Sequence, residues 1–280
     1  MKKLDKKNYS KVLEPLSKLN FNTQFAKTVL DNNIKGNIYV DNADSPNAFY
    51  IAHPYGMSLL FGDSSNKEFI NCLYSYITNS NNVRNKREWL QAYPKEWKKV
   101  FKDILGSDLI HCDDIDTKDM ISKISNKVMY STRLNFKFDY AKYKITREKF
   151  NLNEYNIVLT TIELFNEIQG SVVPKAFWEN AQQFIKFGKG FTLLYEDAIA
   201  STAFASFINK TQLELGIETV EKYRGLGFAS LVCVKLIDYC LEKNLEPVWS
   251  CNKTNVGSSS LAQKLGFEQT VTLPYYKLMN

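Results

Sequence analysis

The sequence lacks the long apolar runs that mark membrane proteins. No apolar stretch in its 280 residues approaches the ~18 residues that a membrane-spanning helix needs. The N-terminal sequence MKKLDKKNYSKVLEPL is positively charged, but no apolar segment follows it, so it does not predict a secretory signal. We therefore expect a cytoplasmic protein with no membrane partner.

Cysteine and histidine are too sparse to suggest a metal centre. The five cysteines are an odd number, contain no CxxC pair and have no histidine at zinc-ligand spacing. The two histidines, His53 and His111, lie in the first half of the chain, where a lone histidine is usually structural. We expect reduced thiols, no metal cofactor, and a buried, inert Cys251 rather than a nucleophile.

The sequence also lacks a strong charge excess. Its 36 basic and 30 acidic residues leave a net charge of +6, which favours an anionic ligand only mildly. The basic runs KKLDKK, VRNKREW and KEWKK are interrupted by acidic residues, so we interpret them as solvated surface. The sequence predicts no nucleic-acid partner.

What the chain does contain is enough length and apolar content for two mixed α/β domains. Residues 1–150 alternate helix-like and strand-like segments without an evident catalytic constellation, and a polar stretch at 141–156 suggests a boundary near residue 150. Residues 151–280 are more regular: a strand, two helices, a hairpin, and a strand at 212–220. A helix at 228–244, a strand at 246–251, a short helix and a final strand complete the order. The fold class predicted is α/β (α+β).

The sequence VEKYRGLGFAS, residues 220–230, places Arg224, Gly225 and Gly227 between a strand and a helix. An isolated glycine pair in such a position is more often a plain turn than a ligand site. Here the helix begins with amide N–H groups that lack internal partners, and the arginine can add a charge-assisted contact. Together these features predict a site for a pyrophosphate.

Two familiar nucleotide motifs do not fit this turn. Ser230 stands where a dinucleotide fingerprint needs its third glycine, the next strand does not end on an acidic residue, and no GK[ST] sequence follows. The pattern Q/R-x-x-G-x-G/A does fit, through Arg224, Gly227 and Ala229. This pattern resembles the acyl-CoA-binding motif of the GNAT superfamily of N-acetyltransferases.

The resemblance extends from about residue 155 to 278. The segments LELGIET…YRGLGFA, LIDYCLEKNLEPVWSC and NVGSSSLAQKLGF, with a weaker match at FIKFGKGFTLL, are similar to the GNAT subfamily that includes zwittermicin-resistance acetyltransferases. The first half resembles it faintly, through YPKEW and Arg133. The resemblance implies that residues 151–280 form a GNAT domain with a mixed, splayed central sheet flanked by helices. The pattern of residues 1–150 predicts a second mixed α/β domain, which we expect to line the acceptor cleft because ligand sites are common between domains.

The resemblance also implies a cofactor site on strand 212–220 and the turn after it. In the family, pantetheine lies along the strand and the pyrophosphate lies on the turn. Asn255 matches a family asparagine near the cofactor, although asparagine is equally typical of a helix N-cap. The implied cofactor-binding residues are Ile217, Glu218, Thr219, Arg224, Gly225, Leu226, Gly227, Phe228, Ala229, Asn255 and Ser258.

The candidate base and acid stay open. Strand alternation puts Glu214 and Glu218 on the same face, and Glu214, which matches a family glutamate, is the first choice as the base that deprotonates the amine. Glu218 is the alternative, and both could simply face solvent or recognise a cationic substrate. The tyrosine that protonates the thiolate in many members is Ala262 here. The acid is therefore left among Tyr275, Tyr276, Ser258, Ser259 and water.

The function that the resemblance implies is direct transfer of an acetyl group from acetyl-CoA to the primary amine of a small acceptor. The oligomeric state is left open, a homodimer included. One alternative is a non-catalytic acyl-CoA-binding sensor or scaffold, which Ala262 keeps open. Another is a tandem-GNAT aminoacyl-transferring enzyme whose first half is a degenerate second copy. A nicotinamide dinucleotide enzyme fits poorly, because the fingerprint is incomplete.

Overall fold

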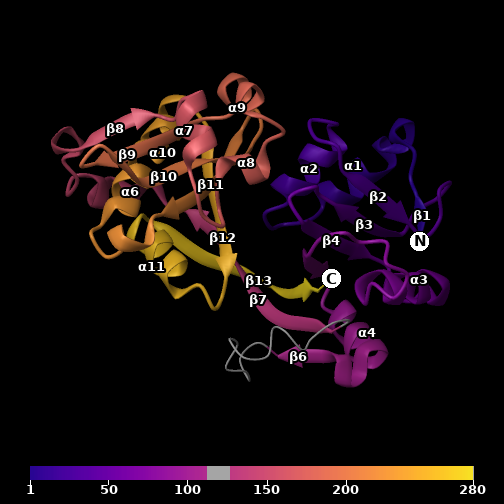
Figure 1. Ribbon diagram of the computed structural model, residues 1–280. Coiled ribbons are helices and arrows are strands. Elements are labelled where there is room, and N and C mark those ends of the chain that lie inside the picture. Colours follow the sequence, from indigo (N-terminus) through magenta and orange to yellow (C-terminus); the bar gives the residue numbers. More distant parts are fainter. Residues whose placement is uncertain (112–126, 280) are drawn as a thin grey trace. The chain divides into compact units, whose positions relative to one another are not determined.

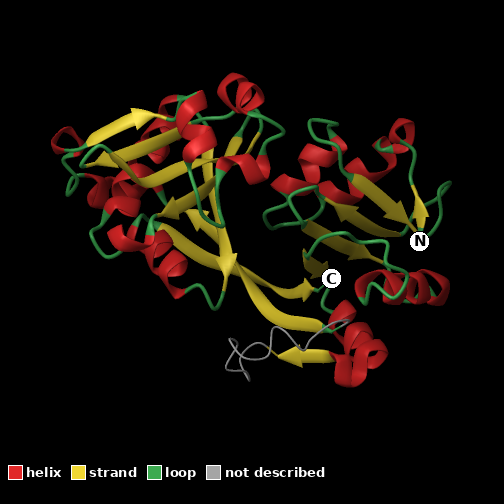
Figure 2. Ribbon diagram, viewed as in Figure 1, coloured by secondary structure: helices red, strands yellow, loops and turns green. Residues whose placement is uncertain are grey.

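The structure, a computed structural model, describes residues 1–111 and 127–279 (Figures 1 and 2). The chain divides into two compact units, and each is described by itself. Unit 1 comprises Met1–Leu134, Asn252–Thr254 and Val271–Asn280; unit 2 comprises Asn135–Cys251 and Asn255–Thr270. Within the described residues, no helix is both long and apolar enough to cross a membrane.

The limits of the units differ from the single boundary near residue 150 that the sequence suggests. Strand β7 (Val128–Phe138) begins in unit 1 and ends in unit 2, and β13 (Phe267–Leu278) does the reverse. The chain therefore changes unit inside two strands, where composition gives no break. The polar stretch near residue 150 contains helix α6 (Tyr140–Arg147) and lies inside unit 2.

Unit 1 is a mixed sheet with helices packed against it, as the sequence predicts. Its strands follow the order β1-β2-β3-β4-β5-β13-β7, with β6 beside β7; β4 and β5 run parallel, and β1 to β4 pair antiparallel. The elements are β1 (Lys2–Lys3), α1 (Ser10–Ser17), α2 (Gln24–Leu30), β2 (Asn37–Val40), β3 (Ala48–Ala52), β4 (Met57–Gly62), α3 (Lys67–Ile77), β5 (Glu88–Tyr93), α4 (Glu96–Leu105) and β6 (Leu109–His111).

Two helices of unit 1 follow directly from their sequence pattern. Helix α3 begins where Asn66 accepts a hydrogen bond from the N–H of Phe69 at 3.0 Å, as an N-cap does. Helix α4 buries Trp97, Phe101 and Leu105, which are spaced four residues apart and so share one face. These side chains join the core of the unit, where the Phe101 ring stacks on Tyr276 at 4.3 Å between ring centroids.

Unit 2 has the strand order β8-β9-β10-β11-β12, flanked by helices on both faces (Figure 2). Helix α10 packs on β9, β10 and β11, and α8 packs on β10. The remaining elements are β8 (Asn156–Leu159), α7 (Ile162–Glu167), α8 (Pro174–Phe177), α9 (Ala181–Phe187), β9 (Gly190–Tyr195), β10 (Ala198–Ile208), β11 (Gln212–Thr219), α10 (Phe228–Glu242), β12 (Glu246–Asn252) and α11 (Val256–Lys264).

Arg84 attaches the C-terminal strand to unit 1. Its guanidinium donates to the carbonyl oxygens of Leu278 and Met279 at 3.4 and 2.6 Å, and also to those of Tyr76, Ile77 and Lys86. The side chain is buried, so these charge-assisted bonds replace water completely. The ammonium group of a lysine carries only three donors and cannot reproduce this planar set of hydrogen bonds.

We therefore predict that Arg84→Lys destabilises unit 1. The expected loss is about 3 kcal/mol in the free energy of unfolding, because buried carbonyl acceptors lose their charged donor. Urea titration followed by tryptophan fluorescence measures it. Lys18→Ala, which removes only an exposed ion pair with Glu14, is the control and should change little. A loss below about 1 kcal/mol for Arg84→Lys would contradict the role given to Arg84.

Candidate functional site

Strands β11 and β12 of unit 2 run parallel for three residue pairs and then separate. The pairs are Gln212 with Glu246, Leu213 with Pro247, and Glu214 with Val248. Beyond Glu214, β11 continues to Thr219 without a partner on that side among the described residues. We call this opening the fork. The predicted splayed sheet is thereby confirmed in unit 2.

A β-bulge in the neighbouring strand accompanies the fork. The register between β10 and β11 shifts between Ala205 and Phe207, opposite Leu215 and Glu214. The extra residue, Ser206, donates its hydroxyl to the carbonyl oxygen of Glu214 at 3.0 Å. A bulge bends and twists the strands at its position, so β11 turns away from β12 at the step where pairing ends.

The fork exposes backbone groups of β11 that a ligand could pair with. The N–H of Val220 donates to Ala200 on β10 at 3.0 Å, so alternation directs the backbone groups of Thr219 and Ile217 to the opposite side, into the fork. Ile217 and Thr219 were both predicted to contact pantetheine. The Thr219 carbonyl accepts a hydrogen bond from Arg224, and the other groups of this edge are suited to pairing with an extended amide chain.

The turn after β11 carries free amides. Gly225 and Gly227 have φ of 84° and 81°, a left-handed conformation that favours glycine, and Gly227 precedes the first residue of α10. Among the described residues, none accepts a hydrogen bond from the N–H groups of residues 225–229. A Cβ built on either glycine meets no atom within 4 Å. The glycines are therefore required by backbone angles, and the space beside them is open to a ligand.

The two charged residues beside this turn contact each other. Nη2 of Arg224 lies 3.6 Å from Oε1 of Glu218, and Nε of Arg224 donates a hydrogen bond to the carbonyl oxygen of Thr219 at 3.2 Å. Glu218 Oε2 accepts the N–H groups of Ser171 and Val172 at 2.8 and 2.9 Å. Arg224 remains largely exposed, whereas the Glu218 side chain is 12% exposed.

Glu218 thus links the turn to the segment between α7 and α8. A Cβ on Gly170, whose φ is 141°, would lie 2.5 Å from the Glu218 carboxyl, so this close approach requires glycine. The contact could not be read from the sequence, since residues 170–172 are 46 or more positions away and carry no motif. It gives Glu218 a structural task in addition to its predicted ones.

Glu214 lies at the base of the fork. It is the last residue of β11 that pairs with β12, and its side chain is 4% exposed. Its Oε1 accepts a hydrogen bond from the hydroxyl of Ser250 at 2.9 Å, across the two diverging strands. Sequence reasoning missed Ser250, although it stands in a strand that was predicted, because the register of a parallel pair cannot be read from one chain.

Helix α11 places Asn255 and Ser258 at its first turn. The side chain of Asn255 accepts from the N–H of Ser258 at 3.1 Å, which is the N-cap role considered for it. The Ser258 hydroxyl accepts from Nε1 of Trp249 at 3.1 Å. Both residues belong to unit 2, as do the turn and Glu214.

The structure does not bring the two tail tyrosines into unit 2. Tyr275 and Tyr276 belong to unit 1. Tyr276 is fully enclosed in the core, and its burial raises the pKa of the phenol far above the usual value, which suits packing rather than proton transfer. Tyr275 stacks on Trp89 at 5.0 Å and lies under the guanidinium of Arg133. Cys251 is buried, as expected.

Unit 1 contains the same strand–helix–strand arrangement in a closed form. Strands β4 and β5 are parallel and joined by α3, as β11 and β12 are joined by α10. Here five consecutive pairs, from Met57 with Trp89 to Phe61 with Tyr93, hold the strands together. The link from β4 to α3 is DSSN, which has no arginine and no glycine pair. The described part of unit 1 therefore has neither a fork between β4 and β5 nor a pyrophosphate turn after β4.

The profile of the GNAT acetyltransferase family matches residues 2–276. The chain belongs to this family. It is 28% identical over 277 residues to the uncharacterized N-acetyltransferase YdfB of Bacillus subtilis (strain 168), a match that covers 97% of this chain and 96% of that protein. The GNAT assignment makes this protein an acyltransferase.

Solved structures agree on the fold. The GCN5-related N-acetyltransferase-like protein of Streptococcus suis 89/1591 has a TM-score of 0.71 at 20% identity, covering 97% of this chain and 98% of that one. A tandem GNAT protein from the clavulanic acid biosynthesis pathway has a TM-score of 0.58 at 9% identity, covering 98% and 95%. The likeness to a tandem GNAT protein over nearly the whole chain accords with the repeated strand–helix–strand arrangement of the two units.

We predict that replacing both glycines of the turn, Gly225→Ala with Gly227→Ala, weakens acetyl-CoA binding at least tenfold. Alanine at positive φ costs about 1–2 kcal/mol per position and turns the amides away from a bound pyrophosphate. Isothermal titration calorimetry measures the dissociation constant. Gly257→Ala, the same chemical change at an ordinary backbone angle in α11, should leave it unchanged. Equal affinity in a folded double variant would remove the turn from the site.

Proposed function

We propose that this protein transfers an acetyl group from acetyl-CoA to the amine of a small acceptor. The observation that carries the proposal is the fork between β11 and β12, bordered at one end by the glycine turn and at the other by Glu214. An open strand edge and a turn with free amides suit the two ends of a CoA thioester, and a nearby carboxylate suits deprotonation of an amine, which supports the proposal.

The residues of unit 2 fit the donor. The backbone groups of Ile217 and the N–H of Thr219 would bind the amide-containing pantetheine arm, and the N–H groups of residues 225–229 would bind the pyrophosphate. Arg224 is exposed, and its Nη2 contacts Glu218 at 3.6 Å while its Nε bonds the Thr219 carbonyl, so the outer nitrogens of its guanidinium can turn to a phosphate. When bound, acetyl-CoA supplies an activated acetyl thioester.

Glu214 is the base that we propose. It stands where the strands part, and the Ser250 hydroxyl fixes one of its carboxylate oxygens. A carboxylate in this place can take a proton from an incoming ammonium group, directly or through a water molecule. Glu218 is assigned to positioning instead, because its carboxylate accepts two backbone N–H groups and contacts Arg224.

The first test is Glu214→Gln. The amide keeps an oxygen for Ser250 but cannot accept a proton, so we expect kcat to fall by about 10²–10⁴ while the dissociation constant of acetyl-CoA stays the same. Release of free CoA thiol, measured with a panel of primary amines, gives kcat. The control is Glu246→Gln on β12. The Glu246 carboxylate accepts a hydrogen bond from the side chain of Gln212 at the surface.

Three outcomes distinguish an enzyme with Glu214 as its base from the alternatives. A lowered kcat with unchanged affinity supports Glu214 as the base. Unchanged kcat excludes it from that role. Tight acetyl-CoA binding by the unmodified protein, with no amine in the panel turned over, would support the sensor or scaffold alternative instead.

We also predict one acetyl-CoA per chain. In the described part of unit 1, β4 and β5 stay paired and no glycine turn follows β4, so we expect no second donor site of the same kind there. Calorimetric titration of the full chain gives the stoichiometry. A value near two would contradict this prediction and would favour a tandem enzyme with two working copies.

A further inference from the structure

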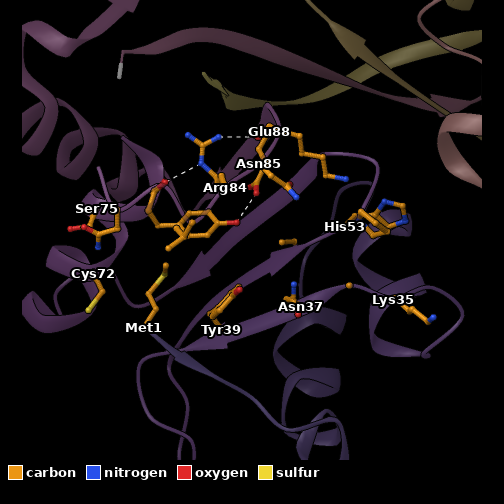
Figure 3. A pocket seen from close by; sticks show the side chains of 17 residues that line it. Met1, Lys35, Asn37, Tyr39, His53, Cys72, Ser75, Arg84, Asn85 and Glu88 are labelled. Carbon is orange, nitrogen blue, oxygen red and sulfur yellow. Dashed lines mark hydrogen bonds between the residues drawn. The ribbon is translucent and has the colours of Figure 1, made fainter. Parts of the chain in front are cut away.

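Unit 1 contains a cavity of about 420 Å³ that the acyl transfer proposed above does not use (Figure 3). Its walls come from β2, the turn after β3, α3, residues 81–86 and the start of β5. The volume is typical of a small-molecule site. All its lining residues belong to unit 1.

The cavity is not a second copy of the fork. The glycine turn of unit 2 follows the end of β11, so its counterpart in unit 1 would follow the end of β4, at residues 63–66. The cavity instead lies beside Glu88, the first residue of β5, at the opposite end of the parallel pair. It therefore needs an explanation of its own.

One wall of the cavity is a buried carboxylate. Glu88 is 6% exposed, and its two oxygens accept hydrogen bonds from the hydroxyls of Tyr50 and Tyr76 at 2.5 and 2.6 Å. Burial and the charge of Glu88 raise the pKa of both phenols, so they remain neutral donors. Among the described residues, no lysine, arginine or histidine nitrogen lies within 4 Å of this carboxylate, although a buried charge is costly without an opposite one.

Aromatic rings surround the same carboxylate. Tyr39, Tyr50 and Tyr76 pack together, with ring centroids 5.1 to 6.4 Å apart, and Tyr39 and Tyr76 line the cavity. The charge of Glu88 also contributes to the raised pKa of Tyr39. Tyrosine rings and a carboxylate both attract an organic ammonium ion. This wall therefore favours an amine in its charged form.

The remaining walls carry positive charge. Lys35 and Lys86 line the cavity and are exposed; partial burial lowers the pKa of Lys86, and the charge of Glu88 opposes this shift. Figure 3 shows Lys35 and His53 on one side, with Cys72 and Ser75 on the other. Burial and the nearby Lys86 lower the pKa of His53 to about 3, which leaves it neutral at pH 7. Arg84 is occupied by backbone carbonyls, so among the lining side chains Lys35 and Lys86 are the cations that can attract an anion.

We propose that this cavity binds a small zwitterion of the amino-acid type, with its ammonium group against Glu88 and the tyrosines and its carboxylate toward Lys35 and Lys86. A zwitterion would meet both the carboxylate of Glu88 and the exposed lysines, whereas a simple amine or a simple acid would meet only one of them. The volume admits one amino acid or a short derivative.

The test is calorimetry on the full chain with each of the standard L-amino acids, the best binder being repeated as its decarboxylated amine and its deaminated acid. We expect at least one amino acid to bind, and each single-charge analogue to bind at least tenfold more weakly. Glu88→Gln and Lys86→Gln should each weaken binding at least tenfold. Glu68→Gln, an exposed carboxylate on α3 outside the cavity, is the matched control.

Further variants keep the test decisive if Glu88→Gln does not fold. Tyr39→Phe keeps the ring and should keep binding, whereas Tyr39→Ala should weaken it. Saturating acetyl-CoA should not displace the amino acid. The proposal fails if no amino acid binds at about 10 mM, if either analogue binds as tightly as the amino acid, if folded Glu88→Gln or Lys86→Gln binds like the unmodified protein, or if acetyl-CoA displaces the ligand.

Discussion

The separation of β11 from β12 after Glu214 is the constraint on which the proposed site depends. Backbone groups inside a sheet are normally paired, so an open strand edge needs a local cause and a compensation. The bulge at Ser206 supplies the cause, because it turns β11 at the step where pairing ends. On the open side, the hydrogen bond from Arg224 to the Thr219 carbonyl supplies part of the compensation. The carboxylate, the strand edge and the anion site are all placed by this one opening.

The two units show what the fork adds to a shared arrangement. Both contain a parallel strand pair joined by a helix, but β4 and β5 pair over five residues and β11 and β12 over three. The closed pair has a polar link without glycines, whereas the open pair ends in a turn with two glycines at positive φ. In the described part of unit 1, the β4–α3–β5 arrangement repeats this topology without a fork or a glycine turn after β4.

The sequence was most informative where one local pattern determines one local structure. The glycine turn, the helix at residues 228–242 and the N-cap at Asn255 could each be predicted, because backbone angle, periodicity and capping act over a few residues. Contacts over long sequence separations could not be predicted. The hydrogen bond from the Ser250 hydroxyl to the Glu214 carboxylate depends on strand register. The hydrogen bonds from the backbone of the 170–172 segment to the Glu218 carboxylate depend on tertiary packing. For the same reason, the sequence did not predict that β7 and β13 each begin in one unit and end in the other.

The most direct measurement is hydrogen–deuterium exchange, read by mass spectrometry, with and without saturating acetyl-CoA. The open edge of β11 and the free amides of the turn should become protected, so peptides covering residues 215–231 should exchange more slowly when the ligand is bound. Peptides covering residues 57–66 and 88–93 should not change, because their strands are already paired. Protection at residues 57–66 with none at 215–231 would contradict the account.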